Sequence, residues 1–205
     1  MVLVTAGGGE DGVRLFQQYL ESMPKLSQRN RVYSTLIFGP EMPEATRQEL
    51  EIEASRWPSI KTLTFSDDVM SYLDAADVAV SMGGYGTICE LLSLQKPALV
   101  IPRTRPVEEQ WIRAQRMAEL GLFQTIHPDQ LTPDSLCEKL EDLLDQTVDQ
   151  KSLVPKPVVN LDGLPTLTMS VLNLLMNGSW GHANSDTQVR YQQPERVHEA
   201  LLQLA

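Results

Sequence analysis

Apolar and polar positions follow a repeating order along the first 150 residues of the chain. Short runs of β-branched or apolar residues are typical of strands, and the stretches between them have the spacing of amphipathic helices. The predicted strands are Val2–Thr5, Val32–Phe38, Ile60–Phe65, Val78–Ser81, Ala98–Ile101 and Phe123–Ile126. The predicted helices are Gly12–Met23, Pro43–Arg56, Val69–Ala75, Tyr85–Leu94, Val107–Leu120 and Pro133–Gln146. Strand–helix alternation of this length predicts right-handed βαβ units. We therefore expect a Rossmann-like α/β domain over residues 1–150, with a six-stranded, mostly parallel sheet and helices on both faces.

The pattern changes after residue 150. Residues 151–176 begin with a proline-containing stretch that predicts a loop up to Pro165, and Thr166–Met176 is apolar enough to form a closing helix. Residues 177–205 form a polar tail, in which Pro194–Leu204 has the spacing of a short amphipathic helix. Three segments are therefore expected: a domain at 1–150, a loop and helix at 151–176, and a tail at 177–205.

Composition narrows the classes of function. The net charge of −10, from 17 basic and 27 acidic residues, argues against a nucleic-acid partner and against a polybasic membrane patch. Cys89 and Cys137 belong to no CxxC pair, and the three histidines have no metal-ligand spacing, so we expect neither a disulfide framework nor a metal site. The sequence has neither a signal-peptide pattern nor an apolar stretch of membrane-spanning length, and we expect a cytoplasmic location without a transmembrane segment.

A glycine turn between a strand and a helix carries the most specific chemistry. Gly83-Gly84-Tyr85-Gly86-Thr87 follows the predicted strand Val78–Ser81, and Glu90 comes three residues later. Glycines at such a turn let several amides face a diphosphate, and the helix dipole adds partial positive charge. A carboxylate one turn further along can accept hydrogen bonds from two ribose hydroxyls. A capping box from Thr87 to Glu90 is the structural alternative, in which both side chains only satisfy amides at a helix end.

Another glycine-rich loop, Gly7 to Gly12, follows the first predicted strand and is called the first glycine loop below. Its glycines permit a close backbone approach to an anion, and we include Gly8 and Gly9 among the candidate ligand contacts. Glu10 and Asp11 in the same loop would repel a phosphate lying directly over them. A tight turn with acidic residues at a helix start is therefore the competing interpretation.

The ordered set of motifs resembles the carboxyl-terminal, donor-binding half of a GT-B glycosyltransferase. It is most similar to glycosyltransferase family 28, which includes the UDP-N-acetylglucosamine transferase that forms lipid II. The resemblance extends over about Val2 to Gln146, and its specific part runs from Phe65 to Gly121. The motifs that carry it are the first glycine loop, Phe65-Ser-Asp-Asp-Val, Ala76-Asp-Val-Ala-Val-Ser, Gly83-Gly-Tyr-Gly-Thr-Ile-Cys-Glu90, Lys96-Pro-Ala-Leu-Val-Ile-Pro102 and Glu109-Gln-Trp-Ile-Arg-Ala114.

The resemblance implies a role for each matching position. Ser66 would meet the nucleobase, although Ser66 and Asp67 also predict a helix N-cap with Asp68 in the first turn. Gly84 and Thr87 would contact the diphosphate, and Glu90 the ribose. Gln110, and the segment Arg103 to Arg105, would approach the diphosphate or the donor sugar, a solvated loop being the alternative for the two arginines. The predicted donor-binding residues are Gly8, Gly9, Ser66, Gly83, Gly84, Thr87, Glu90, Arg103, Gln110 and Arg113.

The sequence also departs from the family pattern. Arg113 stands where relatives that use N-acetylglucosamine commonly have Asn, so the donor sugar stays open. Met82 and Tyr85 are bulkier than the residues usual at the turn, and the acidic pair Glu10-Asp11 is atypical of the first loop.

The resemblance implies an inverting transfer of a sugar from a nucleoside diphosphate sugar, with UDP favoured, to a hydroxyl acceptor. The nucleotide sugar is a substrate, and no cofactor is expected.

The acceptor-binding half precedes the donor half in GT-B enzymes and usually supplies the general base, so no catalytic residue is assigned here. We expect a truncated product or one subunit of a split enzyme, such as the eukaryotic dolichol-linked transferase has, with an amino-terminal acceptor domain or separate subunit as partner. Peripheral membrane contact would come through that partner, and Pro194–Leu204 would cross back to it. A nucleotide-sugar epimerase-like domain and a non-catalytic nucleotide-sugar-binding or scaffold subunit are the alternatives.

Overall fold

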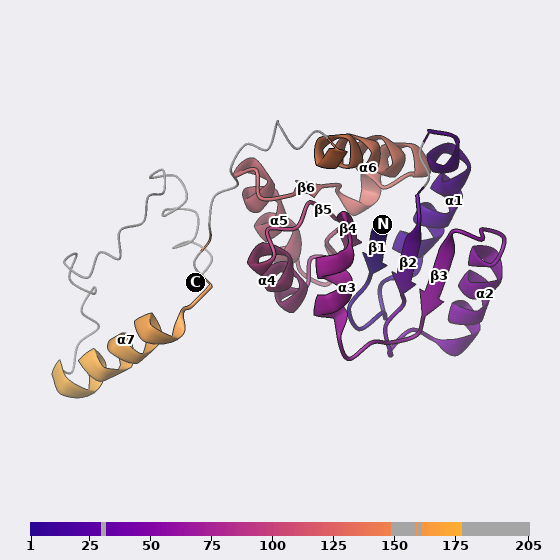
Figure 1. Ribbon diagram of the computed structural model, residues 1–205. Helices are drawn as coiled ribbons and strands as arrows, with labels where there is room; N and C mark the ends of the chain where they lie inside the picture. Colours follow the sequence, from indigo (N-terminus) through magenta and orange to yellow (C-terminus); the bar gives the residue numbers. More distant parts are fainter. Residues whose placement is uncertain (30–31, 149–158, 160, 178–205) are drawn as a thin grey trace. The chain divides into compact units, whose positions relative to one another are not determined.

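Six parallel strands form one sheet, as the alternation of apolar runs predicts (Figure 1). The computed structural model describes residues 1–29, 32–148, 159 and 161–177. The strand order is β3-β2-β1-β4-β5-β6, so the order reverses between β1 and β4. The strands are β1 (Val2–Thr5), β2 (Ser34–Ile37), β3 (Ile60–Leu63), β4 (Val78–Ser81), β5 (Ala98–Val100) and β6 (Gln124–Thr125).

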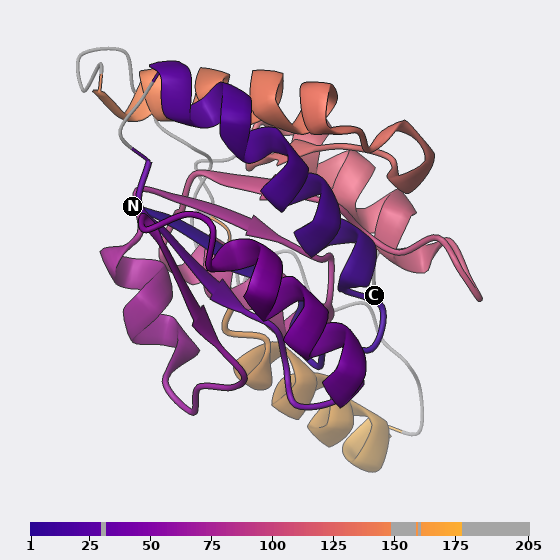
Figure 2. The same ribbon diagram turned by 90° about the vertical axis from the view of Figure 1, so that its right-hand side faces the viewer.

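Helices cover both faces of this sheet. Helix α1 packs against α2 and α6 on one face, and α3 contacts α4 on the other (Figure 2). The helices are α1 (Val13–Arg29), α2 (Glu44–Ala54), α3 (Val69–Ala75), α4 (Tyr85–Ser93), α5 (Glu109–Glu119) and α6 (Pro133–Val148), with a 3-10 turn η1 (Pro128–Gln130) before α6. The predicted Rossmann-like fold class is therefore confirmed.

Burial explains which predicted boundaries are accurate. All four residues of β1, β2 and β4 are buried, as expected for central strands covered by helices on both faces. The bounds of β1 and β4 match the prediction, whereas the edge strand β6 is half-buried and shorter than the predicted Phe123–Ile126. The prediction that α1 ends at Met23 is wrong. The helix continues through Pro24, because Leu26 is fully buried and α1 packs along α6.

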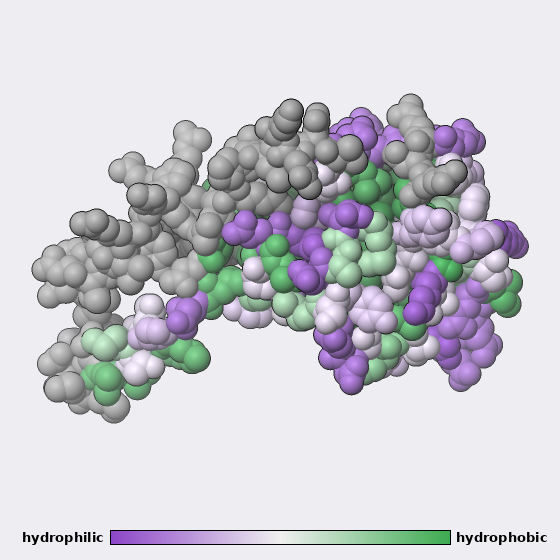
Figure 3. Space-filling model, in the orientation of Figure 1, coloured by the Kyte–Doolittle hydropathy of each residue, from purple (hydrophilic) through white to green (hydrophobic). Residues whose placement is uncertain are grey.

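The chain divides into two compact units, Met1–Pro157 and Val158–Ala205. In the second unit, helix α7 (Leu164–Asn177) begins two residues before the predicted start. Leu164, Leu167 and Met169 are all more than half exposed, and apolar residues cover much of the α7 surface in Figure 3. The predicted helix Pro194–Leu204 lies outside the described residues. Within the part of the chain that the structure describes, no helix has the length and apolarity to cross a membrane.

The register of the strands brings three loops to one edge of the sheet. Thr5 of β1 pairs with Ser81 of β4, and Ser81 pairs in turn with Val100 of β5. Because all three strands are parallel, the loops that start at Ala6, Met82 and Ile101 leave the sheet side by side. Ligands of open parallel sheets bind beyond this edge, next to the point where the strand order reverses. The two glycine loops and the arginine-containing loop after β5 are therefore neighbours.

Lys96 joins the end of α3 to the start of β5. Its ammonium donates to the backbone oxygens of Asp74 and Ala76, at 2.9 and 2.7 Å, and its pKa is lowered chiefly by burial. These bonds satisfy carbonyls that the end of a helix leaves without an intrahelical partner.

Replacement of Lys96 by methionine is expected to lower the free energy of unfolding by about 1–2 kcal/mol, because two charge-assisted, partly exposed hydrogen bonds are lost. Lys61→Met, at an exposed position of β3, is the matched control. Urea denaturation measures both, and equal midpoints for the two variants would contradict this role of Lys96.

Candidate functional site

The glycine turn leads from β4 directly into α4. Helix α4 begins at Tyr85, and Gly84 is its N-cap with φ −59° and ψ 145°. The first helical bond runs from the Ile88 amide to the Gly84 oxygen, at 3.0 Å. The amides of residues 84–87 therefore precede the first intrahelical donor and are available to an anion at the start of the helix.

The three glycines of the turn serve different purposes. A Cβ at Gly83 would lie 2.9 Å from the Cβ of Pro102, so this glycine is needed for close packing within the chain. A Cβ at Gly84 would meet nothing closer than the Thr87 hydroxyl at 3.9 Å, and one at Gly86 would meet nothing within 4 Å. Gly84 and Gly86 thus keep space open that the folded chain itself does not fill.

Glu90 lies one and a half turns into α4 and is half-buried. Partial burial raises its pKa above the ordinary value of 4.5, since a carboxylate is less well solvated there than in water. The capping-box alternative for Thr87 and Glu90 is wrong. Because the helix already begins at Tyr85, Thr87 lies within the first turn and cannot be the N-cap. Glu90 is free of that structural role.

A polar cluster joins the first glycine loop to the loop after β5. The Arg103 guanidinium donates to the Asp11 carboxylate at 3.0 Å, and both side chains are almost half exposed. The Arg103 amide donates to the Gln110 side-chain oxygen at 3.4 Å. Sequence reasoning missed the pairing of Asp11 with Arg103, because it considered the acidic residues only in relation to a phosphate or to the helix start.

Arg113 is buried beneath the turn. Its Nη2 donates to the Gly83 backbone oxygen at 2.7 Å, and its Nη1 pairs with the Glu109 carboxylate. The guanidinium carbon also lies 5.9 Å from the centre of the Tyr85 ring, within the range of a cation–π contact. Arg113 thus belongs to the site through the backbone of the glycine turn.

The first glycine loop packs tightly against the loop after β2. Gly9 has φ +99°, and a Cβ there would lie 2.4 Å from the Phe38 oxygen. A Cβ at Gly8 would lie 2.8 Å from the Glu41 carboxylate, and the Glu41 amide donates to the Gly8 oxygen. Gly9 is buried and Gly8 exposed, so of the two only Gly8 presents its backbone to solvent.

Ser66 lies at the same edge of the sheet but follows β3, which β2 and β1 separate from β4. The prediction that Ser66 and Asp67 form the N-cap of α3 is wrong, because the N-cap is the next residue along the chain. Asp68 is the N-cap and accepts from the Ser71 amide at 3.2 Å, which lowers the pKa of its carboxyl. Ser66 instead accepts from the Asp68 amide at 3.1 Å.

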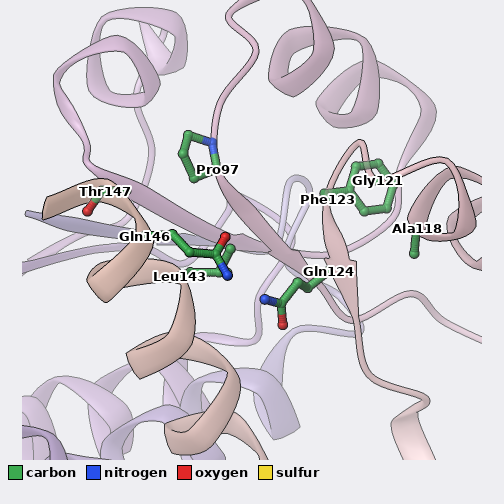
Figure 4. A pocket seen from close by; sticks show the side chains of 8 residues that line it. All are labelled: Pro97, Ala118, Gly121, Phe123, Gln124, Leu143, Gln146 and Thr147. Atoms are coloured by element: carbon green, nitrogen blue, oxygen red, sulfur yellow. The ribbon is translucent and has the colours of Figure 1, made fainter. Parts of the chain in front are cut away.

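A pocket of about 270 Å³ lies at the opposite edge of the sheet (Figure 4). Its lining is mainly apolar and includes Pro97 before β5, Phe123 before β6, and Leu143 near the end of α6. None of the predicted donor-binding residues lines it. Among the described residues, no cluster of three or more His, Cys, Asp or Glu side chains could hold a metal ion.

Comparison with known proteins addresses the family of the chain directly. A family model, the glycosyltransferase family 28 C-terminal domain, matches residues 1–157. The chain belongs to this family. As a family 28 domain, it is 25% identical over 188 residues to a UDP-N-acetylglucosamine--N-acetylmuramyl-(pentapeptide) pyrophosphoryl-undecaprenol N-acetylglucosamine transferase of Chromohalobacter salexigens, covering 91% of the chain and 48% of that relative.

Two solved structures share the fold of this family 28 domain. Acinetobacter baumannii MurG has a TM-score of 0.58 at 20% identity, covering 72% of the chain and 42% of MurG. The ALG13 structure has a TM-score of 0.55 at 20% identity, covering 81% of the chain and 93% of ALG13. The family 28 domain spans less than half the length of the curated relatives it matches. The predicted resemblance and the GT-B half-fold are confirmed.

Proposed function

We propose that the chain is the donor-binding half of an inverting glycosyltransferase that uses a UDP-sugar. The observation that carries the proposal is the open space at Gly84 and Gly86, directly before the free amides of α4, with the half-buried Glu90 further along the same helix. A diphosphate fits the amides and the positive end of the helix dipole. The ribose hydroxyls then lie within reach of a carboxylate, which only accepts hydrogen bonds.

The chemistry follows from where charge develops. An acceptor hydroxyl attacks the anomeric carbon from the face opposite the diphosphate, and the bond from that carbon to the diphosphate oxygen breaks. The electron pair stays on the departing UDP, and the proton of the hydroxyl goes to a base outside this chain. Amides of Gly84 to Thr87, fixed before the reaction starts, stabilise the extra negative charge without having to reorganise. Arg103 adds a positive charge from the neighbouring loop.

An acceptor-binding half completes the proposed enzyme. The curated relatives are more than twice as long as the part of them that this chain matches, whereas ALG13 is matched over 93% of its length. We propose that a preceding domain or a separate subunit supplies the acceptor site and the base, with any membrane contact made through that partner. A cytoplasmic location is part of the same proposal.

Two observations favour this function over the alternatives. An epimerase-like site would require a histidine free to act in the cleft. His127, the histidine among the described residues, accepts from the Asp129 amide at 3.2 Å and packs on the Trp111 ring. A scaffold that had lost its ligand would show a glycine turn blocked by its bulky neighbours. Met82 packs against the hydrophobic core, and Tyr85 is 73% exposed.

Calorimetric titration of the purified chain tests the proposal directly. UDP, GDP, dTDP and UDP-N-acetylglucosamine are titrated into the wild type and into Glu90→Ala. Saturable binding that is strongest for the uridine nucleotides and weaker in the variant supports a UDP-sugar donor site. Preference for another base would correct the donor, and binding that ignores Glu90 would contradict the proposed site.

Replacement of Asp11 by asparagine is expected to raise UDP affinity about twofold to fivefold. The substitution releases Arg103 from an exposed ion pair worth up to about 1 kcal/mol and removes a negative charge near the diphosphate. Glu10→Gln removes the neighbouring charge without touching that pair and is the matched control. Titration at low and high salt measures both variants. The gain should shrink as salt rises, and a loss of affinity in Asp11→Asn would show that Asp11 helps to bind the donor instead.

A further inference from the structure

Arg113 is a buried cation placed directly beside the backbone of the glycine turn. Only 8% of the residue is exposed, although an arginine is rarely buried unless it is paired. Helix α5 directs it inward together with Ala114 and Met117, which are also buried. Its hydrogen bond to the Gly83 oxygen is itself buried and short, at 2.7 Å. Helix α5 therefore places a fixed positive charge against the turn that precedes α4.

The bond from Arg113 sets the direction of the next amide. In a trans peptide, the carbonyl oxygen and the amide hydrogen lie in one plane and point to opposite sides of the C–N bond. The Gly83 oxygen is held toward the Arg113 guanidinium, so the Gly84 N–H points away from it. Gly84 and Gly83 lack side chains, and without this hydrogen bond the peptide between them would have many orientations available.

The hydrogen bonding of the Arg113 guanidinium is not complete within the described part of the chain. Glu109 pairs with one side of the guanidinium, but the Glu109 side chain is 58% exposed. The Arg113 Nε is buried without a hydrogen-bond partner there, as is the hydroxyl of Ser81 at the end of β4. Buried polar atoms without partners are uncommon, and a buried cation is stabilised by an anion bound nearby.

We propose that Arg113 is a positioning residue for the diphosphate of the donor. It acts through the Gly83–Gly84 peptide, whose amide it directs outward, and through the positive potential that it adds from behind the turn. It does not touch the donor itself. The identity of the ligand rests on the proposed function, whereas the role of Arg113 in binding an anion rests on the contacts of the turn.

The test compares Arg113→Met, Arg113→Lys and the matched control Arg116→Met on the same helix. Each purified chain is titrated with UDP, pyrophosphate and uridine, and a thermal melt establishes that each variant is folded.

Arg113→Met is expected to bind UDP and pyrophosphate at least tenfold more weakly than the wild type does. Its affinity for uridine should stay within twofold of the wild type. Arg113→Lys keeps the positive charge and a hydrogen-bond donor group, and it should recover at least threefold of that loss. Arg116→Met should bind like the wild type. If Arg113→Met does not fold, Arg113→Gln replaces it, with the same selective loss for the phosphate-bearing ligands.

The outcomes separate this inference from the proposed function. Equal losses of UDP and uridine in the Arg113 variants, or unchanged UDP binding, would overturn the positioning role while leaving a nucleotide site intact. A wild type that binds pyrophosphate through Arg113 but shows no affinity for uridine would support the positioning role and contradict the nucleotide-sugar proposal. A wild type that binds none of the three ligands would overturn both.

Discussion

Glu90→Ala is expected to weaken UDP binding by about 1–3 kcal/mol, or roughly fivefold to 150-fold, because two buried ribose hydroxyls lose their common acceptor. The loss should extend to uridine, which carries the same ribose. It should be much smaller for 2′-deoxy-UDP, which has only one of the two hydroxyls. Titration of UDP, uridine and 2′-deoxy-UDP into the wild type and into Glu90→Ala measures these losses. A loss of equal size for UDP and 2′-deoxy-UDP would place Glu90 away from the ribose.

The raised pKa of Glu90 adds a pH dependence with a definite sign. As pH is lowered, Glu90 becomes protonated at a pH above its ordinary pKa of 4.5, and the UDP affinity of the wild type should fall at that point. Glu90→Gln should lack this decrease. Stability changes in the opposite direction. Because the folded pKa is raised, the contribution of Glu90 to stability is present below its unfolded pKa and is lost as pH rises through the folded value. Glu90→Gln should therefore melt higher than the wild type at about pH 7, and the difference should shrink in acid.

Gly84→Ala and Gly83→Ala form a pair in which neighbouring substitutions should act for opposite reasons. An alanine fits the backbone angles of Gly84 and meets no close atom, so the stability of the fold should change by less than about 0.5 kcal/mol. The added methyl group occupies the space before the α4 amides, and UDP affinity should fall at least tenfold. Gly83→Ala should instead lower the free energy of unfolding by about 1–3 kcal/mol, because its Cβ would lie 2.9 Å from Pro102.

Denaturant unfolding and UDP titration of both variants give the decisive comparison. Uridine serves as the internal control, since Gly84→Ala should leave its binding nearly unchanged. A Gly84→Ala chain that is stable and binds UDP normally would show that the space before α4 is not the diphosphate site.

The fold was predictable from sequence wherever burial decides the structure. β1 and β4 each have three consecutive apolar residues followed by a hydroxyl residue, and both ends of each strand match the prediction. Local rules failed where packing overrides them: Pro24 does not end α1, because Met23 and Leu26 on either side of it are fully buried against the core. The N-cap of α3 was misplaced because a serine and two aspartates in a row can all cap, and only the path of the loop selects Asp68.

The site was predictable in its motifs but not in its contacts. Glycine spacing predicted the turn of the candidate site, and the resemblance supplied the surrounding candidate residues. The pairing of Arg103 with Asp11 joins residues 92 positions apart, and it depends on the strand order, which no local pattern gives. The burial of Arg113 had a weak signal, since it shares the helical face of Met117, four residues later. An arginine on an apolar face indicates a buried charge, which has to meet a partner.

The pairing of β1 with β4 also has a consequence for how the chain is made. Residues 1–75 contain three strands that form half of the sheet. The glycine turn at Gly83 to Thr87, however, can take its place only when β4 pairs with β1. Pro102, which packs on Gly83, is added later still. Contacts between distant parts of a chain form slowly, because a long loop must close before they are gained. During synthesis, the proposed donor site should therefore form late, and ligand binding would mark the chains in which the two halves of the sheet have joined.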